Sequence, residues 1–268
     1  MQYIVEVNNK TTDEEIKKEL FDLNLMYLKS NEKVAYYYEH ILTGTVFSYN
    51  PNICFYAASS IKILVSLLVF TNAVKGDLDL ESTLTITKDD LKRESRVTDT
   101  FVNDIKYTIR ELIKRTIVES DNTAYIKLVN YVGKDRLIEF GKSLGATHTL
   151  EGVDLFGIVN CSDMKVYWKA INNFIDNESL GKELASYLSE PTVKLVDDDS
   201  IGNNKYLRKY GEYGIAYHEA GIVKDEWPFY LFIMTQKSQI EDKNEFVNDT
   251  AKRLYRIHNM IVRIKNEQ

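Results

Sequence analysis

A nearly unbroken apolar run covers residues 63–70, where Ser66 is the single polar interruption. A segment this apolar has no side that suits water, so we expect a helix buried in the middle of a domain. The helical stretch begins near Tyr56, and Gly76 is expected to end it, because glycine readily adopts the left-handed conformation that follows many helices.

Periodic patterns on the N-terminal side predict one helix and one hairpin. Residues 13–29 place apolar side chains at helical spacing, directly after a capping box at residues 12–15. Residues 34–40 and 45–49 are rich in β-forming residues and are separated by a short segment that contains Gly44, which predicts a β-hairpin.

Short helical patterns dominate residues 77–180, where strand patterns fade. The predicted helices begin at Thr87 and at the capping box Thr108–Glu111, cover 122–132 and 135–144, and end with a helix capped by Ser162 and Asp163. This segment is therefore expected to be an all-helical lobe.

Strand patterns return near residue 205. Residues 206–211, 215–223 and 227–235 predict an antiparallel meander, with a turn at 212–214, and a helix over 246–264 closes the chain. The fold class is α/β (α+β), a five-stranded antiparallel sheet with flanking helices plus an all-helical lobe.

The chain is expected to form a single domain made of two lobes. In this prediction, residues 1–76 and 181–268 form the sheet lobe, and residues 77–180 form the helical lobe.

Composition excludes several classes of function. The 268 residues carry a net charge of −6, which argues against a nucleic-acid partner. Apolar runs are too short for a transmembrane helix, and the N-terminus does not resemble a secretory signal. We therefore expect a cytoplasmic monomer, or an extracytoplasmic one if the native start is missing. Cys54, Cys161 and four scattered histidines show no metal-ligand spacing, so no metal and no cofactor are expected.

Ser59 and Lys62 are the first candidates for chemistry. They are spaced i, i+3 at the start of the buried helix, so the hydroxyl and the amine share one helical face. Unpaired N–H groups and the positive helix end suit a developing anion, and both desolvation and this helix end favour a neutral lysine that can act as a base. The alternative is that Ser59 or Ser60 merely caps the helix while Lys62 reaches solvent. Burial of Lys62 is expected to be partial, so that loss of its amine costs little stability.

Two further motifs favour the catalytic interpretation. Ser120-Asp121-Asn122 lies between two predicted helices, and Lys209-Tyr210-Gly211 lies on the first strand of the meander. Each has an ordinary explanation by itself, a helix cap and a strand with an exposed lysine. In this order and context, the three motifs resemble those of the serine β-lactamases and D,D-peptidases, the penicillin-recognising acyl-serine enzymes.

The resemblance implies a role for each motif residue. Ser59 is the expected nucleophile, Lys62 its base, and Ser120 a proton relay to the leaving group. Asn122 is expected to hold a substrate amide, and Lys209 to attract a substrate carboxylate and to keep Lys62 neutral. The family places its oxyanion hole at the backbone N–H groups that correspond to Ser59 and Glu212, beside Tyr210 and Gly211.

Two departures from the family pattern bear on the substrate. Tyr210 stands where relatives have threonine or serine, so it is predicted to restrict the acyl pocket unless it packs against the protein instead. The segment 148–161 contains Glu151 and Asp154 but no E-x-x-L-N. Either acid could serve in deacylation, but both are expected to be solvated loop charges. Deacylation should then be slow. The expected substrate is a small molecule, a β-lactam or a peptide-like amide or ester; the alternative is a non-catalytic ligand sensor with the same fold.

Overall fold

The computed structural model describes residues 14–152, 154–237 and 240–266, and of residues 240 and 241 only the backbone. It divides into two compact units. The sheet unit comprises residues 1–55, 160–165 and 194–268, and the helical unit comprises 56–159 and 166–193. The segments 56–76 and 181–193 therefore belong to the helical unit, whereas the sequence prediction assigned them to the sheet lobe.

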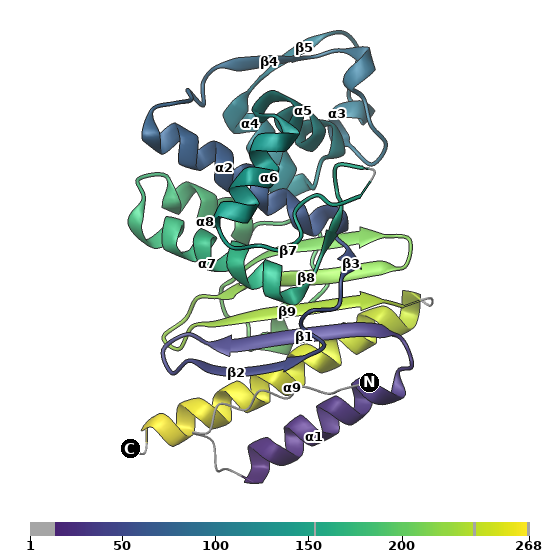
Figure 1. Cartoon of the computed structure of the whole chain (residues 1–268), viewed down its shortest axis with the longest axis vertical. Helices are drawn as coiled ribbons and strands as arrows, with labels where there is room; N and C mark the ends of the chain where they lie inside the picture. Colours follow the sequence, from purple (N-terminus) through teal and green to yellow (C-terminus); the bar gives the residue numbers. More distant parts are fainter. Residues whose placement is uncertain (1–13, 153, 238–239, 267–268) are drawn as a thin grey trace. The chain divides into compact units, whose positions relative to one another are not determined.

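The sheet unit is built on five antiparallel strands in the order β2-β1-β9-β8-β7 (Figure 1). This confirms the predicted five-stranded antiparallel sheet, including the hairpin of the first two strands. The strands are β1 (Lys33–His40), β2 (Thr45–Tyr49), β7 (Tyr206–Tyr213), β8 (Ala216–Val223) and β9 (Phe229–Gln236).

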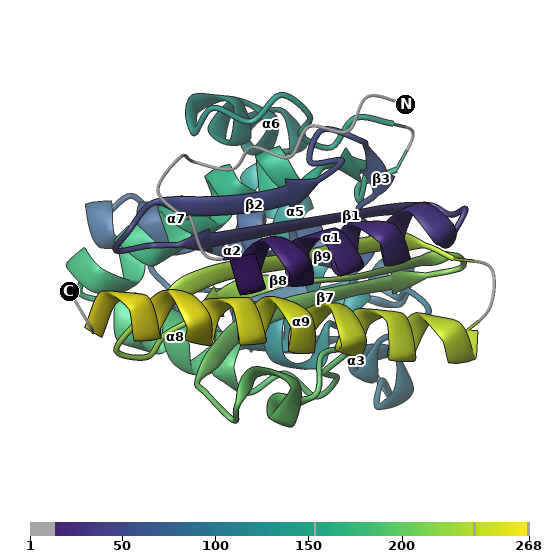
Figure 2. The same ribbon diagram turned by 90° about the horizontal axis from the view of Figure 1, so that it is seen from below.

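Two helices, α1 (Glu14–Lys29) and α9 (Ile240–Asn266), lie side by side on one face of this sheet (Figure 2). The apolar stripe predicted for the closing helix is buried there. Tyr27 of α1 packs edge-on against Tyr36 and Tyr49 of the sheet, with ring centroids 5.1 and 5.2 Å apart. The predicted helix 13–29 is thus observed, while the capping box at 12–15 lies partly outside the described residues.

The helical unit is organised around α2 (Lys62–Lys75), which packs against α5 and α6. The Gly76 N–H group bonds the carbonyls of Ala73 and Asn72 from a φ of 80°, as expected for the residue that ends this helix. The other elements of this unit are η1 (Ala58–Ile61), β4 (Thr83–Ile86), η2 (Lys88–Asp90), α3 (Arg96–Asp99), β5 (Ile105–Thr108), α4 (Ile109–Lys114), the π-helical turn η3 (Arg115–Glu119), α5 (Asn122–Val132), α6 (Lys134–Ser143), β6 (Ile158–Val159) and α8 (Gly181–Ser189).

Two elements cross from one unit to the other along the chain: β3 (Phe55–Tyr56) and α7 (Cys161–Asn177). The first turn of α7 is capped by Asn160, whose Oδ1 accepts a 2.7 Å hydrogen bond from the Asp163 N–H group. The predicted cap at Ser162 and Asp163 is therefore displaced by two to three residues.

Two further sequence predictions are wrong. The helical unit is not all-helical, because β4 and β5 pair as an antiparallel two-stranded sheet. Residues 212 and 213 do not form a turn; they extend β7, and Glu212 pairs with Tyr217 of the next strand. In both cases cross-strand pairing, which local patterns do not report, decides the conformation.

Candidate functional site

Ser59 lies in the short 3-10 turn η1 that precedes α2, rather than inside the α-helix. Ala58 immediately before it has a φ of 47°, in the left-handed region that non-glycine residues rarely occupy. The neighbouring Ser60 is buried and donates its hydroxyl to the Ala57 carbonyl at 2.6 Å. Ser59 is partly exposed, and among the described residues its hydroxyl has no hydrogen-bond partner. Of the two serines, Ser59 is therefore the one whose hydroxyl can meet a substrate.

Lys62 is the first residue of α2, and its side chain is completely buried. The expectation of partial burial is wrong, and so is the alternative in which the amine reaches solvent. The amine instead lies 2.5 Å from the Ser120 carbonyl oxygen, 2.7 Å from Asn122 Oδ1 and 3.3 Å from Ser120 Oγ. The rings of Tyr125 and Phe156 complete the enclosure, with centroids 5.6 and 5.7 Å from the amine.

Burial lowers the pKa of Lys62 to about 7, although the charges of Asp121 and Glu94 act in the opposite direction. The hydrogen-bond partners fit the neutral form. A neutral amine has two N–H donors, which match the two oxygens that can only accept, on the Ser120 backbone and the Asn122 amide. Its lone pair is left for a hydroxyl such as that of Ser120. The lysine can thus be neutral at pH 7 without leaving a buried donor or acceptor unmatched.

Ser120 is held in position by an irregular backbone. The π-helical turn η3 ends in Ser120, whose φ of 55° and ψ of 33° are left-handed, and the Asp121 N–H group bonds back to Arg115 at 3.1 Å. Single π turns often mark functional sites. This turn directs the Ser120 carbonyl toward Lys62, where a regular helix would direct it along its own axis.

Asp121 is buried and anchors this turn to the preceding loop. Its carboxylate caps α5 through the Ala124 N–H group at 2.8 Å and accepts from the Val97 N–H group and the Ser95 hydroxyl. The Asn122 amide links Lys62 to the loop that precedes this turn. Its Oδ1 accepts from Lys62, and its Nδ2 donates to the Arg93 carbonyl at 3.0 Å. The residues predicted from the second motif are therefore brought together with Lys62.

The loop at residues 148–161 holds the two acids considered for deacylation. Asp154 is not a solvated charge: it accepts from the N–H groups of Phe156 and Gly157 and from the Tyr56 hydroxyl, each at 2.9 Å. Burial raises the pKa of Asp154, but these hydrogen bonds outweigh it and leave the pKa below its usual value. A carboxylate engaged in this way shapes the loop and is poorly suited to act as a base. Glu151 is exposed, as expected.

In the sheet unit, the third motif lies on β7, an edge strand. Lys209 is buried and pairs with Ala220, Tyr210 with Glu219, Gly211 with His218, and Glu212 with Tyr217. Successive side chains leave a strand on opposite faces. Tyr210 packs against the apolar cluster formed with α1 and α9, while the amine of Lys209 lies 4.0 Å from the centroid of the Tyr210 ring.

A buried ion pair beside this motif was not predicted from the sequence. Arg208 bonds Glu219 at 3.1 Å and the Val196 carbonyl at 2.6 Å, and it also pairs with Asp198. Glu219 accepts from the Leu195 N–H group at 2.7 Å, and its burial raises its pKa more than these partners lower it. The pair fastens residues 195–198 to the edge of the sheet. The alternation of the strand could have signalled it, because Arg208 falls on the apolar face.

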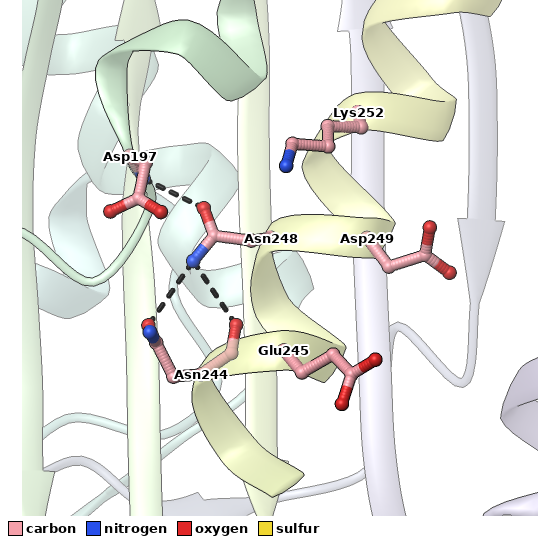
Figure 3. A pocket seen from close by; sticks show the side chains of 6 residues that line it. All are labelled: Asp197, Asn244, Glu245, Asn248, Asp249 and Lys252. Carbon is pink, nitrogen blue, oxygen red and sulfur yellow. Dashed lines mark hydrogen bonds between the residues drawn. The ribbon is translucent and has the colours of Figure 1, made fainter. Parts of the chain in front are cut away.

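A surface cavity of about 420 Å³ in the sheet unit contains none of the motif residues (Figure 3). Asn248, one of the residues that line it, accepts from the Asp197 N–H group and donates to Asn244, so its amide is already engaged. Within the described ranges, we find no group of three or more histidine, cysteine or acidic residues that could hold a metal ion. Among the described residues, one helical stretch, Ala58–Lys75 (η1 and α2), meets the length and hydropathy criteria for a membrane span, and 67% of it is buried inside the protein.

Comparison with known proteins assigns the sequence to a family. Residues 14–258 match the sequence model described as the β-lactamase enzyme family. Among solved structures, PBP-A gives a TM-score of 0.83 at 17% identity, over 92% of this chain and 97% of that one. A mutant of PBP-A, solved as an acyl-enzyme complex with penicillin G, gives 0.82 at 16% identity, over 92% and 97%. The β-lactamase from Sphaerobacter thermophilus gives 0.80 at 16% identity, over 91% and 97%. At these identities the structural likeness shows the fold.

Proposed function

The chain belongs to the β-lactamase enzyme family, and from this premise we propose that it is an acyl-serine hydrolase that opens an amide or ester through a Ser59 acyl-enzyme. One observation carries the proposal. Lys62 is completely buried with a pKa of about 7, and it lies one helical turn from the partly exposed Ser59. A base whose pKa lies near the working pH is what general base catalysis requires.

In the proposed acylation, the Ser59 hydroxyl attacks the substrate carbonyl carbon while its proton passes to the neutral amine of Lys62. The bond between Ser59 Oγ and the carbonyl carbon forms, and the bond to the leaving nitrogen or oxygen breaks. The proton returns from Lys62 through the Ser120 hydroxyl to the leaving group. Water then hydrolyses the ester, which releases the acid and regenerates Ser59.

The remaining motif residues are proposed to bind the substrate. Asn122 retains one N–H of its amide beyond the bond to Arg93, and this group can donate to a substrate carbonyl. Lys209, which Tyr210 and Gly211 follow on β7, is proposed to bind the substrate carboxylate, and the backbone N–H groups of Ser59 and Glu212 are proposed as the oxyanion donors. These roles rest on the family resemblance. The acyl-enzyme that a PBP-A mutant forms with penicillin G supports a β-lactam as the substrate, and a D-amino-acid amide is the peptide-like substrate that the family resemblance implies.

The proposal is tested by intact-protein mass spectrometry after exposure to a fluorescent penicillin and, separately, to a fluorophosphonate. We expect one adduct on the wild-type chain, located at Ser59 by peptide mapping. Ser59→Ala should abolish it. Ser60→Ala is the matched control and should still be labelled, because this buried hydroxyl donates to the Ala57 carbonyl and has no other partner in the described part of the chain. No adduct with either reagent would favour the alternative, a ligand-binding sensor that retains the fold.

A further inference from the structure

A second cavity lies in the helical unit, where residues of α2, α5 and α6 line it. Its volume is about 470 Å³, and none of the motif residues contributes to its lining. Asn72 lines it ten residues after Lys62 in α2, and Val132 lines it ten residues after Asn122 in α5. At a rise of about 1.5 Å per residue, these two lining residues lie about 15 Å along their helices from the proposed base and the second motif. The cavity is therefore separate from the proposed acylation site.

Apolar side chains supply a large part of the lining. Leu68 of α2 and Val132 of α5 are buried, and the half-buried Leu78 lines the cavity as well. Tyr131 adds an aromatic ring that is 46% exposed. Water gains little from apolar walls of this kind, so a ligand with apolar groups is favoured to displace it.

Two opposite charges line the same cavity without pairing with each other. Asp77 and Arg136 are exposed, and neither side chain bonds any residue that the structure describes. The side-chain amide of Asn72 and the hydroxyl of Tyr131 also have no partner within the described ranges. A ligand that enters from solvent can thus meet four polar groups without breaking an existing contact.

The backbone holds the two charges in place. The Asp77 N–H group donates to the Asn72 carbonyl at 2.9 Å, across the turn that ends α2. Arg136 lies in the first turn of α6, where the Leu137 N–H group donates to the Gly133 carbonyl at 3.1 Å. Groups carried on fixed backbone lose less freedom when they bind a ligand, which favours binding.

We propose that this cavity is a second ligand site, and that it binds a small zwitterion with an apolar body, such as a dipeptide of aliphatic residues with free termini. The ammonium of the ligand pairs with Asp77, its carboxylate pairs with Arg136, and its apolar side chains cover Leu68 and Val132. A ligand with one charge leaves the opposite charge of the cavity unmatched, whereas a zwitterion matches both. The volume lies within the range of small-molecule sites in proteins.

The test compares leucyl-leucine with three analogues by isothermal titration calorimetry of the full chain at pH 7 and low salt. N-acetyl-leucyl-leucine lacks the ammonium, leucyl-leucine amide lacks the carboxylate, and glycylglycine lacks the apolar body. We expect Kd to rise about fivefold for loss of either charge, since the pairs are exposed, and at least about tenfold for loss of the apolar body. No binding of leucyl-leucine, or equal binding of all four compounds, would overturn the proposal.

Two variants assign the charges. Arg136→Gln should abolish the preference for the free carboxylate over the amide, and Asp77→Asn should abolish the preference for the free amine over its acetylated form. Arg136→Lys keeps the charge, and Glu139→Gln removes an exposed charge of α6 that does not line the cavity, so both should retain the wild-type preferences. All four changes are at exposed positions, where the fold tolerates them. Unchanged preferences in both Arg136→Gln and Asp77→Asn would show that the dipeptide binds elsewhere.

A dipeptide can also enter the proposed acylation site, so the titration is repeated with that site blocked. The chain modified at Ser59 by a fluorophosphonate, and the Ser59→Ala variant, should bind leucyl-leucine with the wild-type Kd. Loss of binding in either protein would place the dipeptide at Ser59 and overturn the second site. If the fluorophosphonate does not modify Ser59, the proposed acyl-serine function is wrong, whereas binding to Ser59→Ala still decides whether the cavity is a ligand site.

Discussion

The amine of Lys62 lies 2.5 Å from the carbonyl oxygen of Ser120 and 3.3 Å from the hydroxyl oxygen of the same residue. The carbonyl can only accept a hydrogen bond, so it orients the amine, while the hydroxyl can both donate and accept. One residue thus positions the proposed base and offers it a route for its proton. The contact joins α2 to the turn before α5, which are 58 residues apart in the chain.

The first prediction is a pH profile. Because the neutral amine is the active form, acylation of Ser59 should rise with pH and level off above a midpoint near 7, the pKa of Lys62. Lys62→Ala and Lys62→Arg should both lose at least about 10²-fold in rate, since the first has no base and the second stays protonated. Stopped-flow labelling with a fluorescent penicillin from pH 5 to 10 measures this. Labelling of Lys62→Ala at the wild-type rate would exclude Lys62 as the base.

The second prediction concerns stability. The pKa of Lys62 is about 7 in the folded chain but about 10.4 when unfolded, so between these values the unfolded chain binds more protons. Raising the pH from 7 to 10 therefore stabilises the wild type relative to Lys62→Met, by up to about 1.4 kcal/mol per pH unit. Urea denaturation of both proteins at pH 7 and at pH 9 measures, at each pH, the difference between their free energies of unfolding. If the free energies of unfolding of the two proteins changed equally with pH, the pKa of Lys62 would not be shifted in the folded chain.

The third prediction is that β-lactam hydrolysis is limited by deacylation. Asp154 is engaged by Tyr56, Phe156 and Gly157, and Glu151 is exposed in a loop without the E-x-x-L-N pattern. A chromogenic cephalosporin should give a burst of about one equivalent, followed by slow turnover. Glu151→Gln should leave the slow phase unchanged. Rapid turnover that is lost in Glu151→Gln would instead identify this residue as the deacylating base.

Sequence patterns could predict α2 as a buried helix, because an apolar run with no polar face is stable in water only when the protein interior covers it. They could not predict the full burial of Lys62. Lysine is almost never fully buried without partners, and its partners Ser120 and Asn122 come from a distant turn. The left-handed conformations of Ala58 and Ser120 were missed for the same reason. Neither residue type favours that conformation, and only tertiary packing imposes it.

The strands β4 and β5 were missed for a different reason. Each is only four residues long, so its alternation of polar and apolar residues is at the lower limit of what predicts a strand, and its side chains are mostly exposed or half-buried. A long segment with its own helical turns also separates the two strands, so nothing local indicates that they pair. The meander, by contrast, was predicted because β9 is an apolar run rich in strand-forming residues and a charged turn at 224–226 separates it from β8.

The fourth prediction concerns acid stability of the sheet unit. His40 and His258 are buried and stacked at 5.4 Å, and the Tyr38 hydroxyl lies 2.9 Å from His258 Nδ1. Burial lowers the pKa of His40, and it lowers that of His258 to about 3. The unfolded chain therefore gains protons below about pH 6.5 that the folded chain does not, and stability falls as the pH drops.

Between pH 6.5 and 4.5, the titration of His258 should lower the free energy of unfolding of the wild type by up to about 1.4 kcal/mol per pH unit, and His40 contributes in the same direction. His258→Gln retains an acceptor for the Tyr38 hydroxyl but does not titrate. Its free energy of unfolding should therefore fall less than that of the wild type over the same pH range, by the amount that the titration of one histidine contributes. Chemical denaturation at the two pH values measures the difference. Equal losses in both proteins would mean that His258 is protonated in the folded state.

The last prediction concerns Tyr210. Its half-buried ring packs against the apolar cluster of the sheet unit and lies under the amine of Lys209. Tyr210→Thr removes these contacts, so we expect a loss of about 1–3 kcal/mol in the free energy of unfolding and little change in the acylation rate of Ser59. Tyr210→Phe is the matched control, because it keeps the ring and should keep most of the stability. Acylation rate constants with a penicillin, measured for all three proteins, test the role predicted from the sequence. A faster reaction of Tyr210→Thr, with Tyr210→Phe unchanged, would establish that the ring restricts the acyl pocket and that the native substrate is slimmer than a bicyclic lactam.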